Sequence, residues 1–370
     1  MTDAPRRTST IILAIESTCD ETAAAVVEDG VYVRSNVVAS QAKVHEIYRG
    51  VVPEIASRAH IEHIVPVIQQ ALNQANCTLA DVDAIAVAQR PGLIGSLLIG
   101  VTSAKTLAWA MNKPLIGVDH VQAHLYSVEL GGMGSRVGTL NSTLSDPRPQ
   151  TPGPAFPAIG LVCSGGHTAL YLVRSWTDIT LIGKTIDDAV GEAYDKVAAI
   201  LGLAYPGGKP VDDLAQLGNA KSVRFPRSKL GDGSLDFSFS GLKTAVLYHV
   251  RGHNGRERDA SLLSHQALCD VCAAFQQACI DVLVLKIKRA LHQHSARSVI
   301  VGGGVSANRG LRAALQTIGV PSYLPQLQYC TDNAAMIGGL AHVLLQSGRV
   351  SDLSMDAVTF SALVSQKDAS

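Results

Sequence analysis

Short apolar blocks separated by polar turns run along the chain, and they predict an alternation of strands and helices. The first block is an apolar run at 11–15, a polar turn at 16–22 and a second apolar run at 23–27. This order predicts a strand, a turn and a strand. The same three-part order recurs between residues 158 and 173. A pattern that opens each half of the chain predicts an internal duplication.

The remaining blocks extend the alternation. Further strands are predicted at 84–88, 115–118 and 298–301. Helices with two predicted ends lie at 54–76, 187–201 and 262–292, and the run at 91–100 opens another that continues to about 111. Three more helices are predicted to start after 118, at 306 and at about 332. Pro66 predicts a kink or a late start in its helix. Between 131 and 157, Gly, Ser, Thr and Pro without periodicity predict a linker loop.

Composition places the chain among large folded α/β proteins. It has 370 residues, of which 47% are hydrophobic and 17% charged, so it can build two cores and is not disordered over most of its length. Its net charge is zero, which excludes a protein that coats nucleic acid; any RNA contact must be a local patch or be shared with a partner. Seven scattered cysteines predict a reduced, cytoplasmic chain. No targeting signal is recognisable, and no uninterrupted apolar stretch is long enough to span a bilayer.

Two hairpin turns carry the first chemical signal. IESTCDET occupies 15–22 and CSGGHT occupies 163–168, and a third Gly-rich turn follows at 302–304. Small and hydroxyl residues between strands let backbone N–H groups approach phosphate oxygens. One such turn alone is usually only a turn. Three together resemble the nucleotide cleft of the actin, Hsp70 and sugar-kinase superfamily.

The second signal is a possible metal site. His120 and His124 lie four residues apart on a predicted helix, so both imidazoles face one side. Asp332 stands where the last helix is predicted to begin. Two imidazoles and a carboxylate make a facial metal set. The alternatives are two surface histidines and an N-cap aspartate.

Other candidates carry less chemistry by themselves. Asp195 and Asp212 could accept hydrogen bonds from a ribose, or they could be solvated carboxylates. The HIEH segment at 60–63 and the HVQAH segment at 120–124 both lack the HExxH order of a zinc protease. The Cys269-x-x-Cys272 pair lies in an amphipathic helix without a second pair, which favours packing over zinc.

Ten motifs in one order resemble the TsaD-type tRNA N6-adenosine threonylcarbamoyltransferase family, once labelled O-sialoglycoprotein endopeptidase. They are IESTCDET, PEIASRAH, PGLIGSLLIG, HVQAH, SGGHT, DDAVGEAYDKV, YPGG, FSFSGLKT, GGGVSANRGLR and CTDNAAM. The resemblance spans about Ile11 to Gln346. It implies an α/β fold of two related actin-like (ribonuclease H-like) lobes with a nucleotide and metal cleft between them.

The resemblance also implies an activity and a site. The family transfers threonylcarbamoyl from threonylcarbamoyl-AMP to N6 of the adenosine 3′ of the anticodon in ANN-decoding tRNAs. It implies one divalent metal, most typically iron, with zinc or magnesium possible, on His120, His124 and Asp332. Asp20 and Glu21 fall where the family keeps carboxylates near the reacting centre. The adenylate-binding positions are Val162, Cys163, Ser164, Gly165, Gly166, Asp195, Gly208, Asp212 and Asn308.

The resemblance further implies domains and partners. We expect an N-terminal lobe at 1–135, a linker at 136–156, a C-terminal lobe with a helical insertion at 157–330, and a helix that returns to the cleft, with a tail, at 331–370. The expected partners are tRNA, a paralogous TsaB-type scaffold and a small TsaE-type ATPase, and no membrane. A kinase or ATPase of the same superfamily and a metalloprotease are the alternative functions.

The sequence departs from the family motifs at three places, and it contains one strongly basic segment. Arg90 stands where the family usually has glycine, Lys209 follows YPGG where it has proline, and the loop at 131–157 is long. The densest basic segment is 222–230, in which Arg224, Arg227 and Lys229 surround Phe225. Arginines contact RNA phosphates and an aromatic ring stacks on an unpaired base. This segment is therefore a candidate RNA surface, against the alternative that Phe225 packs inside the second lobe.

Overall fold

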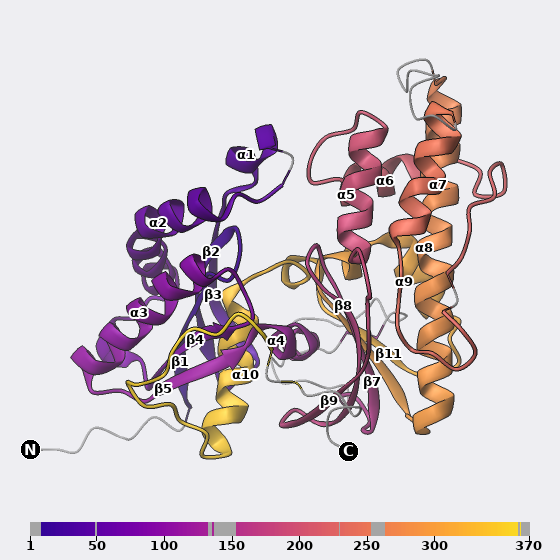
Figure 1. Cartoon of the computed structure of the whole chain (residues 1–370). Helices are drawn as coiled ribbons and strands as arrows, with labels where there is room; N and C mark the ends of the chain where they lie inside the picture. Colours follow the sequence, from indigo (N-terminus) through magenta and orange to yellow (C-terminus); the bar gives the residue numbers. More distant parts are fainter. Residues whose placement is uncertain are drawn as a thin grey trace, which may run out of the picture. The chain divides into compact units, whose positions relative to one another are not determined.

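The computed structural model describes residues 9–48, 50–131, 135–136, 153–228, 230–252, 263–361 and 363. The chain forms two compact units, and most of their helices and strands are labelled in Figure 1. Unit 1 comprises the described residues between 1 and 134 and between 332 and 362, with Gly153. Unit 2 comprises 135–136 and the described residues between 154 and 331, with Leu363.

Unit 1 is built on a five-stranded sheet in the order β3-β2-β1-β4-β5. Its strands are β1 (Ile11–Glu16), β2 (Glu21–Glu28), β3 (Tyr32–Ser40), β4 (Ala84–Arg90) and β5 (Leu115–Asp119). The β1, β2 and β3 strands pair antiparallel, whereas β4 pairs parallel with both β1 and β5. All six residues of β1 are buried, which explains its continuous apolar run.

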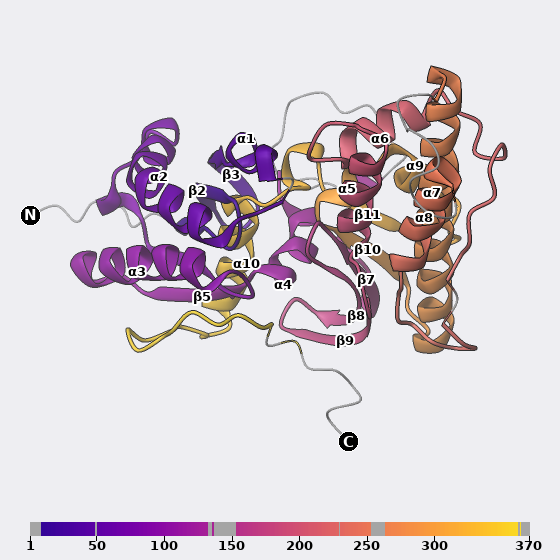
Figure 2. The same cartoon turned by 45° about the horizontal axis from the view of Figure 1, so that its top comes forward.

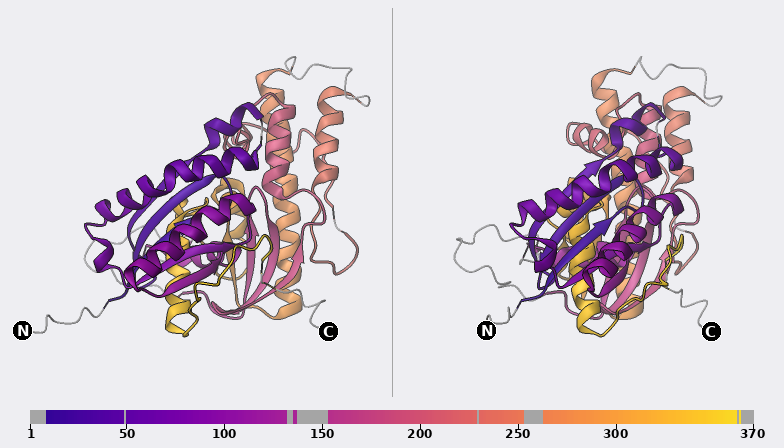
Figure 3. Two further views of the ribbon diagram at one scale, coloured as in Figure 1. Left: turned by 60° about the vertical axis from the view of Figure 1, so that its left-hand side comes forward. Right: turned by 90° about the vertical axis from the view of Figure 1, so that its left-hand side faces the viewer.

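Helices cover both faces of this sheet. The helices are α1 (Ala42–His45), η1 (Glu46–Tyr48), α2 (Pro53–Gln74), η2 (Leu79–Asp81), α3 (Ile94–Met111), α4 (His120–Tyr126), η3 (Ser127–Glu129) and α10 (Ala334–Gln346). Ala24 of β2 packs in a cluster with α2. Val27 follows three residues later in β2 and lies against α10. A Cβ added to Gly338 of α10 would be 2.8 Å from the Val27 side chain. Successive strand residues point to opposite faces, so α2 and α10 lie on opposite sides of the sheet (Figure 3).

Unit 2 repeats the strand order of unit 1 and adds one strand at an edge. Its sheet runs β6-β11-β10-β7-β8-β9. The strands are β6 (Ser135–Arg136), β7 (Ala158–Cys163), β8 (Thr168–Ser175), β9 (Asp178–Lys184), β10 (Ser298–Gly302) and β11 (Ser322–Leu324). The β7, β8 and β9 strands pair antiparallel, and β10 pairs parallel with β7 and β11. Without β6, this is the topology of unit 1, which confirms the predicted duplication and the α/β fold class.

One continuous core holds the helices of unit 2 to its sheet. The helices are α5 (Val190–Ile200), α6 (Gly208–Ala215), α7 (Ser240–Arg251), α8 (His265–His294), η5 (Gly304–Ala307), α9 (Arg309–Leu315) and η6 (Leu327–Tyr329). The long α8, orange in Figure 2, contributes Phe275, Cys279 and Leu283 to this core. Cys269 and Cys272 are also buried in α8, as packing residues should be.

Several predicted boundaries need correction. The β3 strand was not predicted, and α2 starts at Pro53 and continues through Pro66. The helix predicted from 187 starts at Val190, because the Asp187 carboxylate accepts hydrogen bonds at the start of α7 instead. The predicted linker at 131–157 lies largely outside the described residues, as does the predicted start of α8 at 262.

Two helices are long and apolar enough to cross a membrane by length and composition, although Lys105 interrupts α3 and Asp281 interrupts α8. The α3 and α8 helices each hold an 18-residue window with mean hydropathies of 1.3 and 1.7. The window of α8 is 67% buried and that of α3 is 33% buried. The core helix of a soluble protein passes the same test, so packing accounts for the apolar character of α8.

Candidate functional site

The junction between β5 and α4 places two histidines on one face of a short helix. The Asp119 side chain caps α4, since its Oδ1 accepts hydrogen bonds from the backbone N–H groups of Val121 at 3.0 Å and Gln122 at 3.1 Å. His120 and His124 lie one turn apart on this helix. Their ring centroids are 4.6 Å apart, so the two imidazoles share one small volume.

Asp332 joins these histidines in unit 1. Its Oδ1 lies 3.6 Å from His120 Nε2 and 3.1 Å from His124 Nε2. One ligand atom from each of the three residues lies within 4.8 Å of the other two. The N-cap of α10 is the next residue, Asn333, whose side chain accepts from the N–H of Met336. Asp332 is therefore not the helix cap, and its carboxylate faces the histidines.

Glu16 orients the first of the two imidazoles, a role that the sequence patterns did not reveal. It is the last residue of β1 and is fully buried. Its Oε2 accepts a hydrogen bond from His120 Nδ1 at 2.8 Å, and its Oε1 accepts one from the N–H of Thr18 at 2.6 Å. Because Nδ1 donates to Glu16, Nε2 of His120 is left to face Asp332. The available signal was a charged residue at the end of a buried strand.

The electrostatics of this group suit a cation. Burial alone would lower the pKa of His120, but the Glu16 carboxylate and then Asp332 raise this pKa to about 9. Burial lowers the pKa of His124, although its hydrogen bond to Asp332 opposes the shift. The group thus offers one carboxylate, one imidazole oriented by a second carboxylate and one imidazole that stays neutral. This donor set fits a divalent metal ion.

The hairpin between β1 and β2 brings two further carboxyl groups beside Asp332. The pKa of Glu21 is raised well above its usual value by burial, then by the negative charges of Asp332 and Asp20. The Ser40 hydroxyl, which donates to Glu21 Oε1 at 3.3 Å, opposes this shift. Asp20 and Glu21 are both half-buried. Burial, together with the nearby negative charges, therefore makes Glu21 hold a proton more tightly than an exposed glutamate does.

His60, whose motif carried no zinc chemistry, braces this hairpin from α2. Its Nε2 lies 3.0 Å from the Cys19 carbonyl oxygen, and its Nδ1 lies 2.7 Å from Thr22 Oγ1. A carbonyl only accepts, so Nε2 carries the proton and Nδ1 accepts from the Thr22 hydroxyl. Burial lowers the pKa of His60, which favours this neutral form. One buried ring therefore fixes both ends of the turn that carries Asp20 and Glu21.

Replacing Thr22 with Val should test this brace. Valine keeps the shape of threonine but leaves His60 Nδ1 unpaired in a buried setting, so the free energy of unfolding should fall by about 1–3 kcal/mol. Urea denaturation of the metal-free protein measures it. The control is Thr106→Val on the exposed face of α3, expected within about 0.5 kcal/mol of the parent. Equal stability of the Thr22 and Thr106 variants would rule out the brace.

Unit 2 holds the second predicted hairpin, between β7 and β8. The N–H of Ser164 donates to the His167 carbonyl at 2.8 Å, and the Ser164 hydroxyl accepts from the N–H of His167 at 3.1 Å. Behind the turn, the N–H of Gly191 donates to the Ser164 carbonyl at 3.2 Å. The turn is thus fixed by its own polar groups and by the start of α5.

Three of the predicted adenylate-binding positions have no structural reason to be glycine. A Cβ added to Gly165, Gly166 or Gly208 would meet no protein atom within 4 Å, and none of the three has a positive φ. Gly191 differs, because a Cβ there would lie 2.5 Å from the Ser164 carbonyl oxygen. The open space beside the first three glycines is room for a ligand.

The predicted ribose carboxylates are already engaged in the fold. Asp195 Oδ1 accepts from the N–H of Gly207 at 2.7 Å. Asp212 is buried, and its Oδ1 accepts from Gln276 Nε2 at 3.0 Å and from Asn308 Nδ2 at 3.1 Å. Its Oδ2 accepts from Arg309 Nε at 2.7 Å. Asp195 braces the YPGG turn, and Asp212 organises a buried polar network.

Asn308 belongs to the same network, and two strand residues face the core. Asn308 caps α9 through the N–H of Leu311, and its Nδ2 donates to Gln276 Oε1 at 2.7 Å. Gln276 and Arg309, which tie these groups together, were not among the predicted site residues. Val162 and Cys163 are fully buried, so only their backbone groups can meet a ligand.

Comparison with known proteins decides the family. The family model described as TsaD, tRNA N6-adenosine threonylcarbamoyltransferase, matches residues 32–136 and 135–339. A protein of that name from Trichlorobacter lovleyi is 48% identical over 351 residues, covering 94% of this chain and 95% of its own. The chain belongs to the tRNA N6-adenosine threonylcarbamoyltransferase family. A second member, from Bacillus subtilis, is 46% identical and covers 91% of each chain.

Solved structures agree with this family at the level of the fold. The structure of T. kodakarensis HypF aligns with a TM-score of 0.55 at 12% identity, covering 93% of this chain and 48% of that one. Full-length HypF in its phosphate- and nucleotide-bound form aligns with a TM-score of 0.54 at 13% identity, covering 92% and 47%. At such low identity the likeness concerns the actin-like fold alone. Membership of a transferase family decides against the kinase and metalloprotease alternatives.

Two departures from the threonylcarbamoyltransferase pattern have visible partners. Arg90 ends β4, and its Nη2 donates to Gln89 Oε1 at 2.8 Å. Lys209 lies in the first turn of α6 and pairs with Asp213 at 2.5 Å, with 84% of its side chain exposed. Lys209 therefore lies on the surface, and neither residue is among the three metal-site residues.

Proposed function

We propose that the chain transfers the threonylcarbamoyl group from threonylcarbamoyl-AMP to N6 of the adenosine 3′ of the anticodon in ANN-decoding tRNAs. The product is N6-threonylcarbamoyladenosine, or t6A. The observation that carries the proposal is the meeting of His120, His124 and Asp332 in a chain that is 48% identical to a transferase of this name. In the reaction, N6 attacks the carbamoyl carbon, the bond from that carbon to the phosphate oxygen breaks, and AMP and a proton leave.

The metal centre is proposed on these three residues, with Glu16 as the residue that orients His120. Iron is the ion that the family resemblance favours, and zinc and magnesium are the alternatives. When bound, such an ion supplies Lewis acidity towards phosphate oxygens. The chain's own contribution is a buried, pre-oriented set of three donors, in which Glu16 fixes the tautomer of one imidazole.

We propose Glu21 as the group that takes the N6 proton, with Asp20 beside it. A base with a raised pKa is better matched to proton transfer near neutral pH than an ordinary carboxylate. Burial and the charge of Asp20 supply such a shift in Glu21. Asp332 also raises the pKa of Glu21, and this effect shrinks when a cation neutralises the Asp332 carboxylate. Burial and the charge of Asp20 still raise the pKa of Glu21. His60 holds the turn in which both groups lie.

The adenylate is proposed to lie against Ser164, Gly165, Gly166 and Gly208, with backbone groups of Val162 and Cys163 beside it. The open space beside these glycines supports this assignment. Asp195, Asp212 and Asn308 are proposed to act mainly as positioning residues, because their side chains already brace the YPGG turn and the start of α9.

Gly208→Leu and Gly166→Leu should each weaken binding of an adenylate analogue by at least about tenfold, because a side chain would fill the ligand's space. Thermal stability should fall little, since a Cβ at either position meets no protein atom within 4 Å. Calorimetry and thermal denaturation measure the two effects. Gly241→Leu in α7, where a Cβ also meets nothing within 4 Å, is the matched control. Full affinity in the Gly208 and Gly166 variants would remove these residues from the nucleotide site.

Protein partners are proposed on the helical face of unit 1. Ile61 and Val65 on α2 are 61% and 70% exposed, and Ile94 and Leu98 on α3 are 50% and 41% exposed. The α2 and α3 helices approach closely at this level, since a Cβ at Gly95 would lie 2.3 Å from Ser57 Oγ. A grouped apolar surface is typical of a protein interface, and we propose that the paralogous TsaB-type scaffold covers it. A TsaE-type ATPase and a cytoplasmic location complete the proposal.

A reconstituted transfer assay tests the function. The chain is mixed with threonylcarbamoyl-AMP, an ANN-decoding tRNA transcript and the two partner proteins, and the tRNA is digested and analysed by mass spectrometry. We expect t6A in the complete mixture, and none when the target adenosine is replaced by guanosine. A complete mixture that leaves the tRNA unmodified, with all components shown to be folded, would contradict the proposal.

A further inference from the structure

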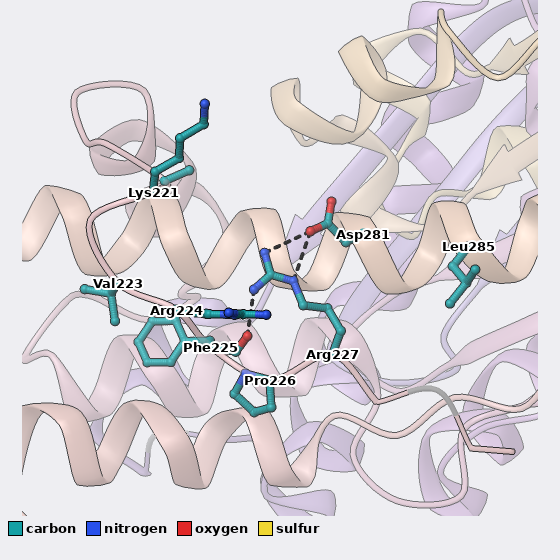
Figure 4. A pocket seen from close by; sticks show the side chains of 9 residues that line it. Lys221, Val223, Arg224, Phe225, Pro226, Arg227, Asp281 and Leu285 are labelled. Carbon is teal, nitrogen blue, oxygen red and sulfur yellow. Dashed lines mark hydrogen bonds and ion pairs between the residues drawn. The ribbon is translucent and has the colours of Figure 1, made fainter.

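The segment before α7 and the outer face of α8 enclose a basic hollow in unit 2. The cavity has a volume of about 740 Å³ and lies between the 220–227 segment and Asp281 and Leu285 of α8. Figure 4 shows Lys221, Arg224 and Arg227 around it. Asp281 is the one carboxylate among its lining residues. The lining therefore carries an excess of positive charge in a chain whose net charge is zero.

Two residues of the basic segment serve the fold rather than a ligand. Arg227 donates from Nε at 3.0 Å and from Nη2 at 2.8 Å to Asp281 Oδ2, and from Nη1 at 2.6 Å to the Phe225 carbonyl. Phe225 is only 3% exposed, and its ring packs edge-on against His249 at 5.7 Å. The expectation that Phe225 stacks on an RNA base is thus wrong, because its ring is part of the core. Lys229 lies outside the described residues.

The other two cations are unengaged. The side chains of Lys221 and Arg224 are exposed, and within the described parts of the chain neither charged group has a hydrogen bond or an ion pair. The loop that carries them is held in place by the Arg227–Asp281 pair and by the buried Phe225 ring. Two free positive groups on a fixed loop lose little backbone freedom when they bind an anion.

We propose that this hollow binds the phosphate backbone of the substrate tRNA, with Lys221 and Arg224 each contacting a phosphate; the inference rests on the proposed function. A neutral chain needs a concentrated basic surface to hold a polyanion. The geometry also separates roles within the segment: Lys221 and Arg224 bind, whereas Arg227 and Asp281 position the loop. An acidic protein surface is the competing occupant, and the test below distinguishes it.

The test is the double variant Lys221→Ala/Arg224→Ala in the complete assembly with its partner proteins. The logarithm of the tRNA binding constant falls linearly with the logarithm of the salt concentration. Losing two phosphate contacts should make this negative slope less steep by about 1.4–1.8. The ratio of parent to variant tRNA affinity should then fall roughly tenfold between 50 and 200 mM salt. The KM for tRNA should rise while kcat and adenylate affinity stay unchanged, because neither residue belongs to the proposed catalytic or nucleotide site.

The matched control is Lys113→Ala/Arg297→Ala, which removes one lysine and one arginine outside the hollow and should leave the salt slope unaltered. An unchanged slope and affinity in the Lys221/Arg224 variant would overturn the inference, as would a variant that loses binding of polyglutamate but keeps tRNA affinity. Failure of the proposed function has a different signature: the parent protein would then form no t6A, whatever the variant's salt slope.

Discussion

His120→Ala and Asp332→Ala should each abolish both metal binding and threonylcarbamoyl transfer. Each change removes one of three donors that lie within 4.8 Å of one another, and two remaining donors hold a divalent ion far more weakly. Elemental analysis of the purified variants should find little metal, and the transfer assay should detect no t6A. His120→Ala also takes a hydrogen-bond partner from the buried Glu16 carboxylate, so its free energy of unfolding should fall by about 1–3 kcal/mol. Circular dichroism of both variants therefore accompanies the two assays.

Two further variants make the metal prediction specific. Glu16→Gln keeps all three donors but weakens the hydrogen bond that orients His120, and should cost about 10–100-fold in metal affinity or activity. His292→Ala, at an exposed position near the end of α8, should change neither metal content nor transfer. Full metal occupancy in the Asp332 variant would show that the ion lies elsewhere.

Glu21→Gln should lower kcat for transfer by about 10²–10⁴-fold while metal content and adenylate affinity are kept. A glutamine cannot accept the N6 proton, and general-base catalysis contributes about this factor. Single-turnover transfer with saturating tRNA measures the effect. A variant that keeps its parent rate would leave the proton to another group or to solvent.

The pH dependence supplies a companion test. Glu21 must lose its proton to act as a base, so the transfer rate should rise with pH as Glu21 ionises. Asp20→Asn removes a negative charge that raises the pKa of Glu21; this pKa should fall, and the rising limb should move to lower pH. A limb that stays in place in the Asp20 variant, or that persists in Glu21→Gln, would contradict the assignment.

The sequence by itself determined the features whose signal is local. Apolar runs at 11–15 and 158–163 predicted buried strands, because the pattern of a strand depends on neighbouring residues only. The four-residue spacing of His120 and His124 placed both imidazoles on one helical face. The recurrence of strand, turn and strand predicted the duplication that the two sheet orders confirm. Motifs in register also predicted the family, which the comparisons confirm.

Only the tertiary structure decided which side chains meet. Asp332 is 208 residues from His124 in sequence, and they come together because α10 packs on the sheet of unit 1 and against α4. Glu16 is only the end of an apolar run in the sequence, and the fold brings it within hydrogen-bond distance of His120 on α4. The sequence predicted Phe225 as an RNA contact, but packing places its ring in the core of unit 2. Asp212 and Asn308, 96 residues apart, proved to be hydrogen-bonded to each other.

The physical reason is the range of the interactions involved. Secondary structure is set by side-chain periodicity and by backbone hydrogen bonds over a few residues, and these are visible in the order of the letters. A site depends on strand order, on the side of the sheet that a helix covers and on burial, which removes water as a competing partner. Those quantities exist only once distant segments have packed together. Packing therefore brings Glu16, His60 and Asp332, which are ordinary polar residues in the sequence, together around the proposed metal and catalytic site.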